Sequence, residues 1–246
     1  MANVVITGSS KGIGRGLAEQ FLRRGHSVVI TGRDEQDVEK AAASLNAVGQ
    51  AHGGARAIGQ RCDVTHKSEV ETLWRRAVAE FGRVDIWINN AGRATARHEV
   101  HELPESLVHT LVDGNLKGTV FGSQVAIEGF RAQGSGALYN MLGGTFEGKR
   151  LTPRMGVYSS TKAAVWMLTK YLVDENKGRG LVIAAISPGM LISDNWFAEQ
   201  AEMSPEDWTK MKPLMNVLCD HVDTSTPWLV EQVLAFTLGG DYSAAP

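Results

Sequence analysis

The chain has 246 residues, a formal net charge of −2 and two cysteines. That length suits one α/β domain, residues 1–246, with a large apolar core. The near-neutral charge balance gives no reason to expect nucleic acid or an anionic membrane as a partner. Two cysteines make no disulfide framework, no metal site is predicted, and no apolar run reaches the roughly 20 residues that a membrane helix needs. We therefore expect a cytoplasmic protein with no integral membrane association.

The chain begins with a predicted strand, residues 3–7, that runs into a glycine-rich turn and then a helix. The turn reads Gly8-Ser-Ser-Lys-Gly12-Ile-Gly14. Glycines let the backbone approach a pyrophosphate closely, and the helix N-terminus offers unpaired N–H groups and the positive end of its dipole. The pattern predicts a phosphate-binding turn, although the commoner dinucleotide spacing is G-x-G-x-x-G. An ordinary tight turn between a strand and a helix is the alternative.

Short apolar segments and longer helical segments alternate along the rest of the chain. This alternation is typical of a doubly wound, Rossmann-type parallel sheet with helices on both faces. The apolar segments show little polar alternation, as expected for strands that helices cover on both sides. The strands predicted after the first are residues 28–30, 55–59, 84–88, 137–141 and 181–186.

The run Tyr158-Ser-Ser-Thr-Lys162 places a phenol and an ammonium four residues apart, on the same face of a predicted helix. A phenol ordinarily ionises near pH ~10, and a neighbouring cation favours its anion. The pair therefore predicts a proton donor and acceptor that works near neutral pH. This spacing occurs in many helices, but together with the glycine turn it indicates carbonyl and alcohol chemistry.

These motifs, in this order, resemble the short-chain dehydrogenase/reductase family over nearly the whole chain. The glycine turn looks like the family's cofactor loop, and Asn115, Tyr158 and Lys162 match three members of its catalytic tetrad. The resemblance implies a nicotinamide cofactor bound by that turn and by segments after later strands. The residues that it assigns to the cofactor are Gly8, Ser10, Lys11, Gly12, Ile13, Gly14, Arg33, Asp63, Val64, Asn90, Ala91, Gly92, Tyr158, Lys162, Pro188, Gly189, Leu191 and Ser193.

The residues after the second strand bear on which nicotinamide cofactor is used. An acidic residue there binds the ribose 2′-hydroxyl of NAD, whereas an arginine accommodates the 2′-phosphate of NADP. Here the strand ends in Gly32 and is followed by Arg33, and the glycine turn carries Lys11. Each cation alone is commonly a solvated surface charge. Together they favour NADP(H).

The resemblance also implies a role for each matched catalytic residue. Tyr158 would protonate the carbonyl oxygen as the cofactor delivers hydride, and Lys162 would lower the pKa of the tyrosine and bind the nicotinamide ribose. Asn115 would hold a water in the proton relay, and a polar residue that caps or kinks its helix is the alternative. The short interval from Tyr158 to Lys162 favours reduction of a carbonyl over reduction of a carbon–carbon double bond.

The fourth tetrad member, a serine after the fifth strand, is missing. The family usually reads Asn-Ile-Ser-Ser there, but this chain reads Asn140-Met-Leu-Gly-Gly-Thr145. Counting from the strand puts Gly143 at the serine position, and counting back from Tyr158 by the family's usual interval puts Thr145 there. We expect Thr145 to supply the hydroxyl, because a flexible glycine pair lets it swing inward. An ordinary loop threonine is the alternative.

The same loop and the following Leu151-Thr-Pro153 resemble the chlorophyll(ide) b reductase branch, which reduces a formyl group on a chlorin ring with NADPH. A shared loop does not establish a shared substrate. Residues 190–216 hold several methionine and aromatic side chains, and methionine adapts to variable pockets. We expect this segment to cover a bulky, apolar carbonyl or alcohol substrate. A helix that simply packs against the domain is the alternative.

Little sequence follows the last predicted helix, residues 229–236. The final strand common in the family is therefore expected to be very short or absent, or the chain ends early. In relatives this end often contributes to a tetramer contact. We expect a homodimer through the helices that hold Asn115 and Tyr158, because an apolar stripe continues beyond the catalytic face, and a homotetramer is the alternative.

Two classes of function fit the sequence. The first is an NADP(H)-dependent oxidoreductase of the carbonyl reductase or alcohol dehydrogenase type. The second is a nucleotide-sensing regulatory protein that keeps the fold and the cofactor but has lost turnover together with the serine. The retained Tyr158, Lys162 and Asn115 favour the enzyme.

Overall fold

The fold is known from a computed structural model, which describes residues 1–94, 98–143, 146–148, 151–192, 200 and 205–238. Six parallel strands form the central sheet in the order β3-β2-β1-β4-β5-β6. This arrangement confirms the predicted doubly wound parallel sheet. The strands are β1 (Asn3–Ile6), β2 (Ser27–Gly32), β3 (Ala57–Arg61), β4 (Ile86–Asn89), β5 (Gly136–Met141) and β6 (Leu181–Ile186).

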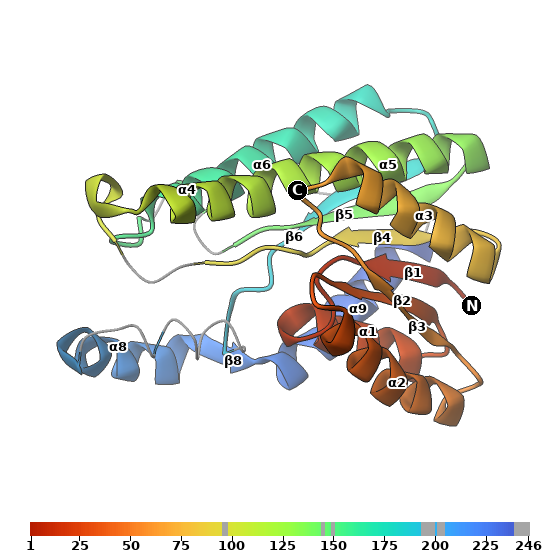
Figure 1. Ribbon diagram of the computed structural model, residues 1–246, viewed down its shortest axis with the longest axis horizontal. Coiled ribbons are helices and arrows are strands. Elements are labelled where there is room, and N and C mark those ends of the chain that lie inside the picture. The colour runs from red at the N-terminus through yellow and green to blue at the C-terminus, as the bar shows by residue number, and fades with distance from the viewer. Residues whose placement is uncertain (95–97, 144–145, 149–150, 193–199, 201–204, 239–246) are drawn as a thin grey trace.

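Helices cover both faces of this sheet (Figure 1). One face carries α1 (Gly12–Arg23), α2 (Glu35–Ala51) and α9 (Val222–Leu238), and the other carries α3 (Lys67–Phe81), α5 (Gly118–Gln133) and α6 (Gly156–Glu175). Two clusters of buried apolar side chains, one on each side of the sheet, form the core. Because both faces are covered, the strands are rich in apolar residues, and β2 is buried along its whole length.

The third strand begins two residues later than predicted. Gly53 and Gly54, with φ angles of 81° and 74°, continue the turn after α2. Positive φ is open to glycine at little cost and breaks the extended backbone that a strand needs. Cys62, directly after β3, is buried in the core, where burial raises the pKa of its thiol to about 12.

The strand order creates a crevice at one point along the sheet edge. After β3 the chain crosses to the other side of β1 and continues as β4, so β1 and β4 are neighbours although their connections run to opposite sides. In open α/β sheets, ligands bind outside the carboxyl ends of the strands at such a switch point. The glycine turn follows β1 and the Asn90 segment follows β4, so both lie at this crevice.

The helix that leads into α5 contains a wider turn. It starts as α4 (Glu105–Leu111), passes through a π-helical turn (Val112–Lys117) and continues as α5. Within the turn the Gly118 N–H bonds to the Asp113 carbonyl, five residues back. π-helical turns often occur at functional sites, and this one contains Asn115. A short 3₁₀ helix (Val100–Glu102) precedes α4.

The segment after β6 contains a small second sheet that the sequence did not predict. β7 (Met190–Ile192) pairs in parallel with β8 (Cys219–His221), and α8 (Pro205–Leu218) lies between them in the chain. Figure 1 shows α4 and α8 beyond the carboxyl ends of the main strands. That this segment covers the substrate stays a prediction, and its residues 193–199 and 201–204 lie outside the described residues.

The end of the described chain is helical. α9 runs to Leu238, and residues 239–246 lie outside the described residues, so the expectation for a final strand stays a prediction. Among the helices that the structure describes, none has the length and apolar character needed to cross a membrane.

Candidate active site

The glycine turn is packed too tightly for side chains. Gly8 and Gly12 have φ angles of 64° and 59°, which favour glycine. A Cβ on Gly8 would lie 2.9 Å from the Cα of Ala91, and one on Gly14 would meet the side-chain amide of Asn90. The turn therefore rests on the segment after β4 and leads into α1, whose N-cap residue has no side-chain cap. This geometry fits a pyrophosphate held by backbone N–H groups.

Thr7 and Asn90 join the turn to the segment after β4. The Thr7 hydroxyl accepts hydrogen bonds from the N–H groups of Asn90 and Ala91, each at 3.0 Å. The Asn90 side-chain amide donates to the carbonyls of Thr7 at 2.9 Å and Gly8 at 3.0 Å. The Gly8 N–H donates to the Thr31 hydroxyl at 3.1 Å. Asn90, predicted to contact the cofactor, thus also fixes the shape of the turn.

Arg33 and Asp63 lie close to each other after β2 and β3. Burial alone would raise the pKa of Asp63, but its carboxylate accepts hydrogen bonds from the Thr65 N–H at 3.0 Å and hydroxyl at 2.8 Å. These bonds and the positive charges of His66 and Arg33 outweigh burial, so the pKa of Asp63 lies below its ordinary value. Arg33 and Asp63, both predicted to contact the cofactor, therefore lie near enough for their charges to interact.

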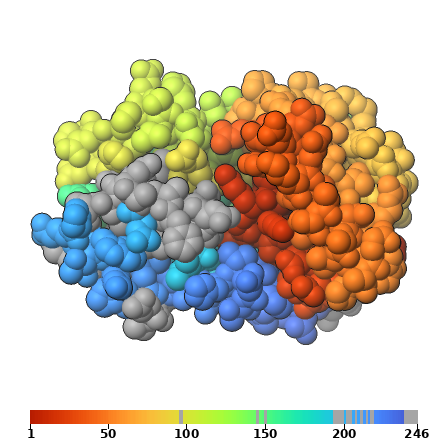
Figure 2. Space-filling view, turned by 60° about the horizontal axis from the view of Figure 1, so that its bottom comes forward, coloured from red at the N-terminus to blue at the C-terminus, as the bar shows by residue number. Residues whose placement is uncertain are grey.

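An open groove beside the glycine turn is lined by several cations. Its volume is about 430 Å³, and it lies open to solvent between the turn, α1 and α2. Lys11, Arg15 and Lys40 contribute positive charge to its walls, and Asp37 is the acidic residue among its lining residues. In Figure 2 the red N-terminal residues lie in the middle of this face, between the orange segment and the blue C-terminal segments. The excess of positive charge suits a phosphate group.

Tyr158 and Lys162 lie four residues apart on α6, as predicted. The Lys162 side chain is only 5% exposed, and its Nζ donates to the carbonyl of Met141, the last residue of β5, at 2.9 Å. Burial lowers the pKa of Lys162 from 10.5 to about 8. A Cβ on Gly92 would lie 3.5 Å from Nζ, so the segment after β4 approaches the same ammonium.

The Asn115 side chain is fully buried and bonded to protein groups. Its Oδ1 accepts from the Arg93 N–H at 2.9 Å, and its Nδ2 donates to the Arg93 carbonyl at 3.0 Å and the Thr161 hydroxyl at 3.2 Å. The Asn115 carbonyl accepts the Thr119 hydroxyl at 2.7 Å. Asn115 therefore fastens the π-helical turn to the segment after β4 and to α6. Its role in holding a water stays a prediction.

Gly143 occupies the position opposite the Tyr158 hydroxyl. A Cβ added to Gly143 would clash with the hydroxyl oxygen of Tyr158 and would lie 3.0 Å from Cζ of the same ring. Of the two ways of counting, the one that starts from the fifth strand therefore identifies the residue next to the phenol. That residue is Gly143, which has no hydroxyl. Thr145 lies outside the described residues, and its part in catalysis stays a prediction.

The segment after β6 lies next to these groups. Met141 pairs with Ile186 across β5 and β6, and the Leu142 N–H donates to the Ile186 carbonyl at 2.8 Å. Pro188 and Gly189 follow directly, and Gly189 has a φ of 74°. Leu191 lies in β7, and Ser193 is outside the described residues.

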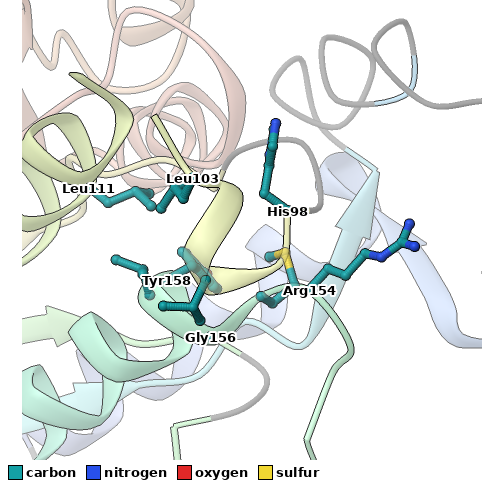
Figure 3. A pocket seen from close by; sticks show the side chains of 9 residues that line it. His98, Leu103, Leu111, Arg154, Gly156 and Tyr158 are labelled. Atoms are coloured by element: carbon teal, nitrogen blue, oxygen red, sulfur yellow. The ribbon is translucent and has the colours of Figure 1, made fainter. Parts of the chain in front are cut away.

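A pocket adjoins Tyr158 on the side of α4 (Figure 3). It is a small cavity of about 10 Å³, which is room for about one water molecule. Its walls come from the loop before α4, from α4 and from the start of α6, and they include His98, Leu103, Leu111 and Arg154. Sequence reasoning did not select these residues, because no motif includes them.

Sequence reasoning also missed the hydroxyls that join the catalytic segments. The Thr7 hydroxyl accepts from the segment after β4 and the Thr161 hydroxyl accepts from Asn115, whereas the Thr119 hydroxyl donates to the Asn115 carbonyl one turn back in its own helix. A threonine in a helix or after a strand carries no pattern of its own. Thr161 lies inside the Tyr-x-x-x-Lys run and Thr7 stands at the start of the glycine-rich cofactor loop, so both had a signal that could have drawn attention to them.

Comparisons with known proteins agree with this geometry. The family model described as short chain dehydrogenase matches residues 2–204. A protein named probable chlorophyll(ide) b reductase, chloroplastic, from Arabidopsis thaliana is 30% identical over 94% of this chain and 48% of its own length. A chloroplastic chlorophyll(ide) b reductase from the same organism is 32% identical over 97% of this chain and 67% of its own length. The chain thus spans about half of the first relative and two thirds of the second.

A solved structure gives the same fold. The 3-ketoacyl-(acyl-carrier-protein) reductase of Brucella melitensis, complexed with NADH, has a TM-score of 0.78 and 22% identity over 96% of this chain and 90% of its own. The sheet, the glycine turn and the Tyr158–Lys162 pair thus describe an oxidoreductase fold for a nicotinamide cofactor. The chain belongs to the short-chain dehydrogenase/reductase family.

Replacing Gly143 tests whether the phenol needs the space that this glycine leaves. In Gly143→Ala and Gly143→Ser we expect kcat for carbonyl reduction to fall about 10²-fold, because the added Cβ displaces the Tyr158 hydroxyl by a sizeable fraction of an ångström. Steady-state kinetics and NADPH titration measure the effect. Gly114→Ala is the matched control, since a Cβ there meets nothing within 4 Å. An increase in kcat for Gly143→Ser would show that the site lacks only the serine hydroxyl.

The lowered pKa of Lys162 predicts how the rate depends on pH. Below about pH 8 the ammonium is charged beside the tyrosine, and it loses its proton as the pH rises through that value. The kcat for carbonyl reduction should therefore fall with an apparent pKa of about 8 in initial rates measured from pH 6 to 10. Lys162→Arg keeps the charge and should move this fall to higher pH. Lys170→Arg, farther along the same helix, is the control, and an unmoved profile in Lys162→Arg contradicts the assignment.

Proposed function

We propose that the protein is an NADP(H)-dependent carbonyl reductase with Tyr158 as its general acid and base. The observation that carries this proposal is the buried Lys162 ammonium, held at the end of β5, four residues from a phenol that adjoins the cofactor crevice. An ammonium in a low-dielectric site strongly favours a nearby anion. A tyrosine beside it is suited to give up and regain a proton near neutral pH.

The bound nicotinamide would supply the hydride that the carbonyl carbon accepts. Tyr158 would donate its phenolic proton to the carbonyl oxygen, so that the carbonyl becomes an alcohol and the phenol a phenolate. Lys162 would stabilise that phenolate, and a proton from solvent would restore the phenol. Gly143 would leave room for the substrate oxygen beside the phenol, and Asn115 would hold the π-helical turn against α6. The reverse sequence oxidises an alcohol.

The preference for NADP(H) over NAD(H) rests on charge at the adenosine end. Arg33 is exposed at the end of β2, where the 2′-position of the ribose lies in this fold. Lys11 adds a second cation at the glycine turn, beside the cationic groove. A 2′-phosphate brings close to two negative charges and would find both cations within the reach of their long side chains. A 2′-hydroxyl gains much less from them.

A bulky carbonyl compound is the substrate class that we propose, and a formyl group on a chlorin ring is the specific candidate. It is favoured by the identity of 30% and 32% with two proteins named as chlorophyll(ide) b reductases. The described parts of 190–216, β7 and α8, lie on the side of the sheet where the main strands end, and we propose that the apolar residues of this segment cover a large ring system. A nucleotide-sensing protein without turnover remains the alternative class.

We further propose a homodimer through α5 and α6. On α6, Met167 and Tyr171 are exposed apolar side chains, 52% and 62% accessible, on the surface that such a contact would cover. The predicted cytoplasmic location stays a prediction, and the two relatives are named as chloroplastic.

The first test is NADPH oxidation by the purified protein with a panel of bulky carbonyls that includes a chlorin aldehyde. We expect turnover that Tyr158→Phe abolishes while NADPH binding is kept, because the substitution removes only the transferable proton. Wild-type turnover in Tyr158→Phe would remove Tyr158 as the acid. Tight NADPH binding without turnover on any carbonyl would support the nucleotide sensor.

A second test concerns the choice of cofactor. Arg33→Ala should raise the dissociation constant of NADPH about 10-fold or more and hardly change that of NADH, because only NADPH carries the 2′-phosphate. Fluorescence titration measures both constants. Arg56→Ala, which removes an exposed cation at the start of β3, is the control. An equal loss for both cofactors contradicts a role for Arg33 in binding the phosphate.

A further inference from the structure

A chain of buried polar side chains joins β4 and β5 to the helices α5 and α6. Asn89 and Asn140 are paired across the two strands, and Asn89 Nδ2 donates to Asn140 Oδ1 at 2.9 Å. Asn140 Nδ2 donates in turn to the Thr169 hydroxyl of α6 at 2.9 Å. The Asn89 amide also donates to the Ser123 hydroxyl of α5 at 3.1 Å. These four residues are each at most 4% exposed, so losing one partner would leave the other unsatisfied.

The bonds of this chain run in one direction. Trp87 Nε1 donates to Asn89 Oδ1 at 2.8 Å, which turns the Asn89 nitrogen toward Asn140. At the other end, the Thr169 hydroxyl donates to the Val165 carbonyl at 2.8 Å, so its oxygen accepts the Asn140 amide. Turning the Asn140 amide over would bring two NH₂ groups together, and turning both amides would set Asn89 against the indole N–H. The contact between β5 and α6 therefore has a single arrangement.

Lys162 lies on the same face of α6 as Thr169. The two residues are seven positions apart, which is two helical turns or about 10 Å along the helix axis. The Lys162 ammonium donates to the carbonyl of Met141, the residue that follows Asn140. Two neighbouring residues of β5 thus hold two points of α6. The threonine contact fixes where α6 lies along β5, and that position decides whether the lysine reaches the carbonyl.

The Lys162 ammonium is sensitive to this position because it is buried. Burial lowers its pKa, and no charged group among the described residues contributes to the shift. The groups that approach it are the Met141 carbonyl of β5, Gly92 of the segment after β4, and Tyr158 one turn back on its own helix. A hydrogen bond to the charged form of a group favours that form. A weaker bond to Met141 therefore lowers the pKa of Lys162 further.

We propose that Asn140 and Thr169 are positioning residues that hold the Lys162 ammonium at the end of β5. Neither side chain transfers a proton or binds the substrate, and both act through the lysine that stabilises the Tyr158 phenolate. The kinetic consequence of this inference rests on the proposed function, whereas its effect on the ammonium rests on the hydrogen bonds alone. The two parts can therefore be measured separately.

The test removes the threonine hydroxyl and follows the titration of Lys162. Thr169→Val keeps the shape of the side chain but leaves the Asn140 amide without its acceptor. The pKa of Lys162 should fall by about 0.5 to 1 unit, as for the weakening of one hydrogen bond. Carbon-13 NMR of protein labelled at lysine Cε measures this pKa without turnover, and the Lys162 signal is identified by its loss in Lys162→Arg. The fall in kcat with rising pH should move to lower pH by the same amount.

Two further variants separate positioning from a loss of stability. Thr226→Val on α9 is the matched control, because Thr226 is also a buried threonine whose hydroxyl donates to the carbonyl four residues back, that of Val222, at 2.8 Å. It should leave the titration of Lys162 unchanged, whatever it does to the melting temperature. Thr169→Ser keeps the hydroxyl and should keep the wild-type pKa of Lys162, although it loses a buried methyl group.

A double variant shows whether the two residues act through one bond. Asn140→Ala alone should also lower the pKa of Lys162, and adding Thr169→Val should cause no further shift, because the bond between them is already absent. If Asn140→Ala does not fold, the three threonine variants decide.

Several outcomes would overturn the positioning role. They are a Lys162 pKa in Thr169→Val that stays in place or rises, an equal shift in Thr226→Val, or shifts that add in the double variant. If the expected NMR shifts appear while the wild type reduces no carbonyl, the proposed function fails and the positioning role stands.

Discussion

The buried ammonium of Lys162 is the constraint on which the arrangement of the site depends. A buried cation needs close hydrogen-bond acceptors, because moving it out of water is costly. Its lowered pKa means that burial disfavours the charged form by roughly 3 kcal/mol. The Met141 carbonyl is the acceptor beside it, and only the end of a strand leaves a carbonyl outside the sheet in this place. The Lys162 side chain thus ties α6 to the carboxyl end of β5.

The same constraint explains why side-chain amides and hydroxyls gather around the crevice. The segments after β1, β4 and β5 and the helix α6 meet here without regular backbone pairing between them. Thr7 and Asn90 supply the missing hydrogen bonds on the cofactor side, and Asn115 and Thr161 supply them on the catalytic side. Each bond joins residues far apart in sequence, so it holds the site geometry without extending the sheet. Because these polar groups are buried or nearly so, losing one partner would leave the other unsatisfied.

The sequence predicted the central sheet and the Tyr158–Lys162 pair well, since both depend on local patterns of apolar residues and on helical spacing. It could not predict the sheet of β7 and β8, because strands of three residues show no periodicity and their pairing is set by the chain between them. For a similar reason, counting residues along the sequence left two candidates, Gly143 and Thr145, for the position of the missing serine. Only the packing of Gly143 against the phenol identifies which residue adjoins Tyr158, and no spacing rule contains that contact.

The glycine at position 143 also changes how the site can orient the carbonyl group of its substrate. A serine hydroxyl would hold the carbonyl oxygen directly, whereas Gly143 leaves space and has no side-chain donor. Orientation then falls to another hydroxyl, which is the role predicted for Thr145, or to contacts farther along the substrate. A substrate that is large and rigid, and that is anchored at its far end, can provide that orientation through position alone. Loss of the serine is therefore compatible with turnover, provided that contacts other than a hydroxyl at position 143 orient the substrate.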